Sequence, residues 1–263
     1  MIRLLDGNEY KKEELLNKMD DDSFYYGQLS SLALSSSSCK KLLESPNSYR
    51  KSFYQSDDTQ PLRDGRLFHL SVLEPHKMND LIVIEGTKAK KEFKDATKEH
   101  GSSMVYTASE VGSANLLGQA LLANSKVNEY LLGAKPEVPA IGEIHGMPFR
   151  GKADALFTCP LTDEVTVIDL KTTSSPIDDF PYSAKKFSYD LQAYIYTRLF
   201  NATEFIFIVI NKTNSDIGIY HCSQDFINQG EYKVIRAIEI YNQFFSGEAS
   251  EEKLKDYYVT GSL

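Results

Sequence analysis

The spacing of apolar residues changes character about halfway along this 263-residue chain. In the first half, apolar positions mostly recur every three or four residues, as on one face of a helix. This spacing predicts helices at 35–43, 62–74, 88–99, 107–122 and 127–132, with short strands at 81–84 and 104–106. After Pro136 the pattern becomes strand-like and predicts strands at 138–145, 148–157, 164–170, 205–210 and 217–221, with helices at 183–200 and 224–245.

The run 205–210 is apolar at every position, which is typical of a strand buried on both faces of a sheet. We therefore expect an α/β fold in which helices flank a mixed β-sheet, following a helical N-terminal third. Residues 31–248 are expected to form a single domain. Residues 1–30 are predicted to be a loosely structured N-terminal segment whose apolar residues at 4–5 and 24–26 could dock, and 249–263 an acidic tail.

Composition narrows the class of protein. The chain is 41% hydrophobic and 25% charged, and it has no run of about eighteen apolar residues, so we expect a soluble cytoplasmic protein. Its three cysteines are scattered, which argues against structural zinc and iron–sulfur clusters. A formal net charge of −8 disfavours non-specific wrapping of nucleic acid but permits a local basic groove.

The strongest candidate chemistry lies on two consecutive predicted strands. Asp169 and Lys171 are two residues apart in a strand and therefore face the same side of the sheet, while Asp154 precedes them on the neighbouring strand. Two carboxylates beside a lysine suit Mg²⁺ and phosphodiester hydrolysis. The carboxylates would bind metal together with the Leu170 carbonyl, and Lys171 would orient or deprotonate the nucleophile. On the following helix, Gln192 shares a face with Tyr196 and could bind phosphate or steady the lysine.

The order of these residues resembles a known pattern. Gly65 to His69, Glu137, Asp154, Asp169-Leu170-Lys171 and Gln192 to Tyr196 follow one another as in the RecB-like branch of the PD-(D/E)XK nuclease superfamily. Two further segments resemble phage RecE-type and lambda-type exonucleases, namely the serine-rich stretch 35–50 with its Ser45-Pro46 pair, and 65–75 with its Leu73-Glu74-Pro75 ending. The resemblance spans about residues 30–245.

This resemblance implies a restriction-endonuclease-like fold and a Mg²⁺-dependent exodeoxyribonuclease, with Mn²⁺ able to substitute. It implies degradation of linear duplex DNA from 5′ to 3′, leaving 3′ overhangs for recombination by annealing. His69 would be a further metal ligand, and Glu137 would be the acidic residue before the hairpin, with Glu143 as its competitor. Processive relatives form trimeric or tetrameric rings, so the resemblance also implies a homo-oligomer, a phage origin and an annealing protein as partner.

Basic and aromatic residues near these motifs are candidate DNA contacts. Tyr189 could stack on an unpaired base, and the cationic candidates for phosphate contacts are Arg63, Arg66, Arg150, Lys152, Lys185 and Lys186. Two other interpretations stay open. A single-strand nuclease or an endonuclease would use the same Asp154, Asp169 and Lys171, whereas a DNA-binding module with a lost active site would be a different class of protein.

Overall fold

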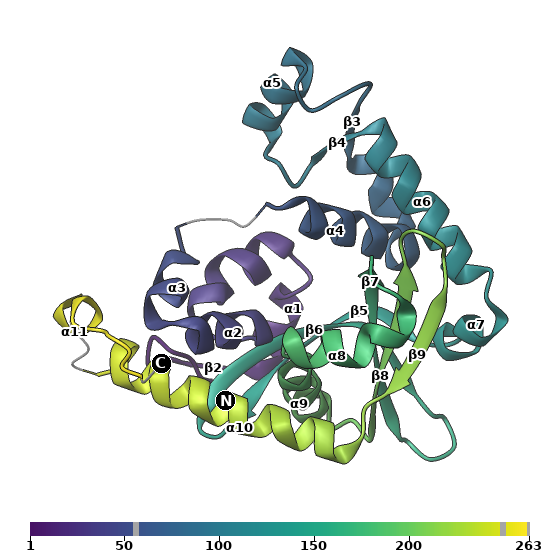
Figure 1. The fold of residues 1–263 in the computed structure, drawn as a ribbon. Coiled ribbons are helices and arrows are strands. Elements are labelled where there is room, and N and C mark those ends of the chain that lie inside the picture. Colours follow the sequence, from purple (N-terminus) through teal and green to yellow (C-terminus); the bar gives the residue numbers. More distant parts are fainter. Residues whose placement is uncertain (55–57, 248–250, 262–263) are drawn as a thin grey trace.

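A five-stranded mixed β-sheet forms the centre of the molecule (Figure 1). The computed structural model describes residues 1–54, 58–247 and 251–261. Strand β7 runs parallel to β8, and the other neighbouring pairs are antiparallel. The predicted α/β class with a mixed sheet is confirmed. In order across the sheet the strands are β5 (Lys135–Ile144), β6 (Met147–Thr158), β7 (Val165–Thr173), β8 (Glu204–Asn211) and β9 (Ile217–His221).

The register of the sheet brings three acidic positions into line. Pairing between β5 and β6 continues on both sides of Glu137, so this residue lies across from Asp154. Pairing between β6 and β7 runs up to Ala155 and Ile168, so Asp154 and Asp169 are the next residues on their strands. The backbone of Glu137 has a φ of 51°, a left-handed conformation that interrupts the regular pairing. The expected placement of Asp154 and Asp169 on consecutive strands is confirmed.

Helices cover both faces of the sheet. Alternate residues of β8 pack toward α9 (Tyr189–Phe200) and α10 (Gln224–Phe245), as Phe205 and Phe207 do. The intervening residues, such as Ile206, pack toward α4 (Gln60–Leu73), α6 (Ala108–Leu122) and α7 (Ser125–Leu131). The apolar run 205–210 is therefore buried on both faces, as its composition predicted.

The helical third supplies α4 to the site and α2 (Ser36–Glu44) beside it. The Ser35 side chain caps α2, as the serine-rich sequence indicated. Pro46 does more than end this helix, because it occupies the first turn of α3 (Pro46–Lys51). Residues 82–107 form an arm that projects from the sheet (Figure 1). In this arm β3 (Ile82–Ile84) pairs in parallel with β4 (Val105–Thr107), and α5 (Lys91–His100) connects the two strands. A 3-10 turn, η3 (Pro75–Asp80), connects α4 to the arm.

The expectation of a loosely structured N-terminal segment is wrong. Residues Leu4, Leu15 and Tyr25 are buried in a small core that includes Ile141 of β5. The apolar residues of this segment follow no long regular period because they belong to several short elements, which left no clear sequence signal. These elements are β1 (Ile2–Arg3), β2 (Glu9–Tyr10), α1 (Lys12–Lys18), η1 (Ser23–Gly27) and η2 (Gln28–Ser31).

Two other segments differ from expectation. The helix predicted at 183–200 is interrupted at Ser188, whose φ of 52° is left-handed, so η4 (Ile177–Asp179) and α8 (Phe180–Lys186) precede α9 as separate turns. The acidic tail contains a short helix, α11 (Glu251–Lys255), while its residues 249–250 and 262–263 lie outside the described part. None of the helices in the described ranges is long and apolar enough to span a membrane.

Candidate active site

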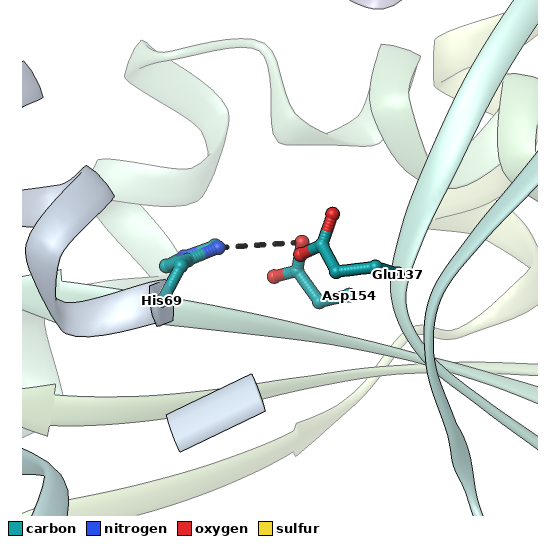
Figure 2. A group of neighbouring side chains, drawn as sticks. All are labelled: His69, Glu137 and Asp154. Carbon is teal, nitrogen blue, oxygen red and sulfur yellow. Dashed lines mark ion pairs between the residues drawn. The ribbon is translucent and has the colours of Figure 1, made fainter. Parts of the chain in front are cut away.

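Three side chains from distant parts of the sequence converge where the helical third meets the sheet. His69 comes from α4, Glu137 from β5 and Asp154 from β6. One ligand atom from each lies within 4.8 Å of the other two. Figure 2 shows the three side chains pointing toward one another, with the ion pair between His69 and Asp154 drawn. This group is a candidate metal centre.

Hydrogen bonds fix two of these side chains to β7. The backbone N–H of Leu170 donates to Asp154 Oδ2 at 2.7 Å, and Asp154 Oδ1 lies 3.5 Å from His69 Nδ1. The other ring nitrogen of His69, Nε2, is 2.9 Å from the Leu170 carbonyl oxygen. Neighbouring ligands of an octahedral Mg²⁺ are about 3 Å apart, so the 2.9 Å between His69 Nε2 and the Leu170 carbonyl oxygen suits two ligands of one ion. The helix and the strand are thereby held at a metal-compatible distance.

Asp169 is held by one residue of α9 and one of its own strand, β7. Gln192 Nε2 donates to Asp169 Oδ1 at 2.5 Å, and the Lys171 ammonium contacts Asp169 Oδ2. This Oδ2 atom is buried, and the Lys171 ammonium is the cation that faces it. Asp169 and Lys171 face the same side of the strand, as the period of two predicted. Gln192, one of whose expected roles was to steady the lysine, steadies the carboxylate instead.

Aromatic rings surround Lys171. Its ammonium lies 5.1 Å from the centre of the Tyr189 ring and 5.8 Å from that of Phe207. Tyr196 is buried against β6, where a side chain on Gly151 would come within 2.8 Å of its ring. The Tyr196 ring therefore packs closely on Gly151 and holds α9 against β6, one helical turn after Gln192.

The charges of the site are strongly coupled. Burial and then the Asp154 carboxylate raise the pKa of Glu137 to about 7. Burial acts to lower the pKa of His69, but Asp154 outweighs it and raises this pKa to about 9. Burial raises the pKa of Asp169 despite the nearby Lys171 ammonium, whereas His69 holds the pKa of Asp154 below its usual value in spite of burial. Without metal the site therefore holds protons that a divalent cation would displace.

We expect Glu137→Gln to stabilise the metal-free protein at high pH. The raised pKa means that ionised Glu137 destabilises the fold, and this penalty grows as the pH rises from 4.5 to about 7. In EDTA at pH 8 the variant should gain on the order of 2 kcal/mol in free energy of unfolding, and at pH 4.5 little. Urea denaturation at both pH values measures this, with exposed Glu143→Gln as the control. An equal gain at both pH values would contradict a raised pKa at Glu137.

The donor set fits a hard divalent cation. Asp154, Glu137 and the Leu170 carbonyl offer oxygen atoms, and His69 offers a nitrogen. Oxygen ligands with one imidazole suit Mg²⁺ or Mn²⁺. The structure thus brings Glu137 to Asp154 and leaves its competitor Glu143 exposed on the same strand.

Three of the cations expected to contact DNA are engaged inside the protein. Arg63 of α4 is buried against the arm, where it pairs with Glu110 of α6 at 3.1 Å and donates to the Val105 carbonyl of β4. Arg150 is buried over the Tyr25 ring, and Lys152 pairs with an aspartate of the N-terminal segment. Such placements argue for structural roles, because these groups already have internal partners. The remaining cationic candidates are partly or fully exposed: Arg66, Lys185 and Lys186.

Three charged residues around Tyr189, whose ring Lys171 contacts, gave no signal in the sequence. Asp190 is buried at the start of α9 and pairs with Lys233 of α10 at 2.7 Å. Lys40 of α2 lies 4.8 Å from the centre of the same Tyr189 ring that Lys171 contacts. Each of the three belongs to an ordinary helical sequence that contains no recognisable motif, so only the tertiary fold shows that they lie near the site.

The fold and the site together define a nuclease domain of the PD-(D/E)XK type. The chain belongs to the family described as a PDDEXK-like domain of unknown function (DUF3799), whose sequence profile matches residues 35–253. The superfamily inferred from the order of His69, Asp154, Asp169 and Lys171 is therefore confirmed. No curated protein is similar enough to the chain to count as a relative.

Solved structures with a similar fold include a provisionally named exonuclease from Eubacterium rectale. The two share 14% sequence identity and a TM-score of 0.61, over 92% of this chain and 95% of the other. A phage-related exonuclease from Haemophilus somnus 129PT is also 14% identical, covering 82% of this chain and 96% of its own length. Its TM-score of 0.38 is too low to equate the two folds. The similarity to the first structure establishes the fold alone.

Proposed function

We propose that this protein is a Mg²⁺-dependent exodeoxyribonuclease, with Mn²⁺ able to replace Mg²⁺. The observation that supports this most is the convergence of His69, Glu137 and Asp154 beside Asp169 and Lys171. A binding module without chemistry would have no need to bury so many ionisable groups at one point, because burying charge is unfavourable unless a ligand compensates it. The fold, the donor set and the lysine all suit hydrolysis of phosphodiesters.

In this proposal each residue has a defined task. Asp154, Glu137, His69 and the Leu170 carbonyl hold the metal, with Asp169 completing the acidic set. The bound cation would supply Lewis-acid polarisation of the scissile phosphate and an acidified water. Lys171 orients or deprotonates the attacking water and offsets charge developing on the phosphate oxygens. Gln192 keeps the Asp169 carboxylate aimed at the site through its hydrogen bond.

The choice of substrate follows from the sequence resemblance. We propose degradation of linear duplex DNA from the 5′ end, in the cytoplasm of a bacterial host, to give 3′ overhangs for a single-strand annealing protein. We also propose a homo-oligomeric ring of three or four subunits. A net charge of −8 is compatible with a ring whose channel is locally basic, because only the channel has to attract phosphate.

Incubation of 5′-labelled linear duplex with the protein and Mg²⁺ tests the activity. We expect progressive release of labelled nucleotides, none in EDTA, and no cleavage of closed circular DNA. Cutting of the circle would instead indicate an endonuclease, and preference for unpaired DNA a single-strand nuclease. Binding without any metal-dependent cleavage would support an inactive DNA-binding module. Light scattering measures the oligomeric state, and a strict monomer would contradict the ring.

A further inference from the structure

Lys40 is a half-buried cation beside the proposed catalytic lysine. It projects from α2, which packs against α9 and α10. Its ammonium lies 4.8 Å from the centre of the Tyr189 ring, and the Lys171 ammonium lies 5.1 Å from the centre of the same ring. Two cations from different elements thus share one aromatic side chain at the edge of the candidate active site.

The carboxylates near Lys40 are already paired with other lysines. Asp169 contacts Lys171, and Asp190 pairs with Lys233 at 2.7 Å. Among the described residues no carboxylate forms an ion pair with Lys40. The group made of Lys40, Lys171, Lys233, Asp169 and Asp190, called here the lysine cluster, therefore has three cations and two carboxylates.

This excess positive charge is unfavourable in a partly buried place. Burial and then repulsion by Lys171 lower the pKa of Lys40 to about 8. Contact with Tyr189 compensates only in part, because a cation–π contact is weaker than pairing with an anion. Such a placement makes sense for a side chain that meets its anion only when a ligand binds.

We propose that Lys40 binds a phosphate oxygen of the DNA substrate next to the phosphate that Lys171 contacts. The inference rests on the proposed nuclease function and adds a substrate-binding residue to it. The negative phosphate would neutralise the excess positive charge of the lysine cluster. The Tyr189 ring would hold the Lys40 and Lys171 ammonium groups in place. Lys40 takes no part in the bond-breaking step, so its contribution belongs to substrate binding.

Steady-state kinetics of Lys40→Met on 5′-labelled linear duplex with Mg²⁺ tests this inference. Loss of one charge-assisted contact should raise KM about 10- to 100-fold and leave kcat within roughly threefold. Lys40→Arg keeps the charge and should bind nearly as well as wild type. Lys41→Met is the matched control, because it removes the same charge from the next residue, whose ammonium faces Glu44 at 3.8 Å. Lys40→Gln replaces the methionine variant if the latter does not fold.

Fluorescence anisotropy of labelled duplex, with Ca²⁺ in place of Mg²⁺, gives a second readout that a purely structural role would not move. The slope of log affinity against log salt should fall by about one for Lys40→Met and stay unchanged for Lys41→Met. An inactive wild type would end the proposed nuclease function. An active wild type, with KM and salt slope unchanged in Lys40→Met, would overturn the role of Lys40 alone.

Discussion

Replacement of Asp154 by Asn is expected to abolish DNA hydrolysis, with kcat/KM falling about 10³-fold or more. The substitution keeps the size of the side chain and an oxygen that can still accept the Leu170 N–H hydrogen bond. It removes the negative charge that faces His69 at 3.5 Å, where the metal would bind. An amide is a much weaker ligand for a hard cation than a carboxylate, so both metal affinity and catalysis should be lost while the fold is kept.

Three measurements separate this outcome from simple unfolding. Circular dichroism should show the same secondary structure in wild type and variant, titration calorimetry with Mn²⁺ should show weakened binding, and the nuclease assay should show the loss of rate. Glu143→Gln removes a charge from an exposed carboxylate of β5 and should leave all three unchanged. Full activity of Asp154→Asn would mean that the metal site lies elsewhere.

Much of the fold could be predicted because burial imposes a period on the sequence. The uninterrupted apolar run of β8 indicated a strand buried on both faces, and the spacing of Asp169 and Lys171 placed both on one side of β7. Prediction failed where a single backbone angle decided the structure. The left-handed conformation of Ser188 divides one expected helix into two, although serine gives no sign of it.

The site could be predicted only in part, for a related reason. Asp154, Asp169 and Lys171 belong to adjacent strands, so their proximity follows from local pattern. Arg63 and Lys40 are different, because their roles depend on which segments fold over them. Nothing near Arg63 in the sequence reveals that Glu110, 47 residues further on, will pair with it in the folded protein. Tertiary contacts therefore gave Arg63 an internal partner and revealed Lys40 as a further candidate DNA contact.

The close contact between α9 and α10 holds the helix that carries Gln192. Gly230 of α10 lies against the backbone of α9, and a Cβ there would come within 2.1 Å of the Asp190 carbonyl oxygen. The same region holds the ion pair between Asp190 and Lys233 at 2.7 Å. A backbone atom cannot move aside as a flexible side chain can, so any larger residue at position 230 must push the two helices apart.

We therefore expect Gly230→Ala to lower the free energy of unfolding by about 3 kcal/mol or more, at the upper end of the range for overpacked cores. Gly112→Ala is the matched control, since Gly112 is an exposed glycine in α6 with no atom within 4 Å of the added Cβ. There alanine should stabilise the protein by about 0.5–1 kcal/mol, because it favours helix over the unfolded chain. Urea denaturation of both variants should give changes of opposite sign. Stabilisation by both substitutions would show that α10 can move away from α9 without loss, and that the backbone contact at Asp190 does not position the helix bearing Gln192.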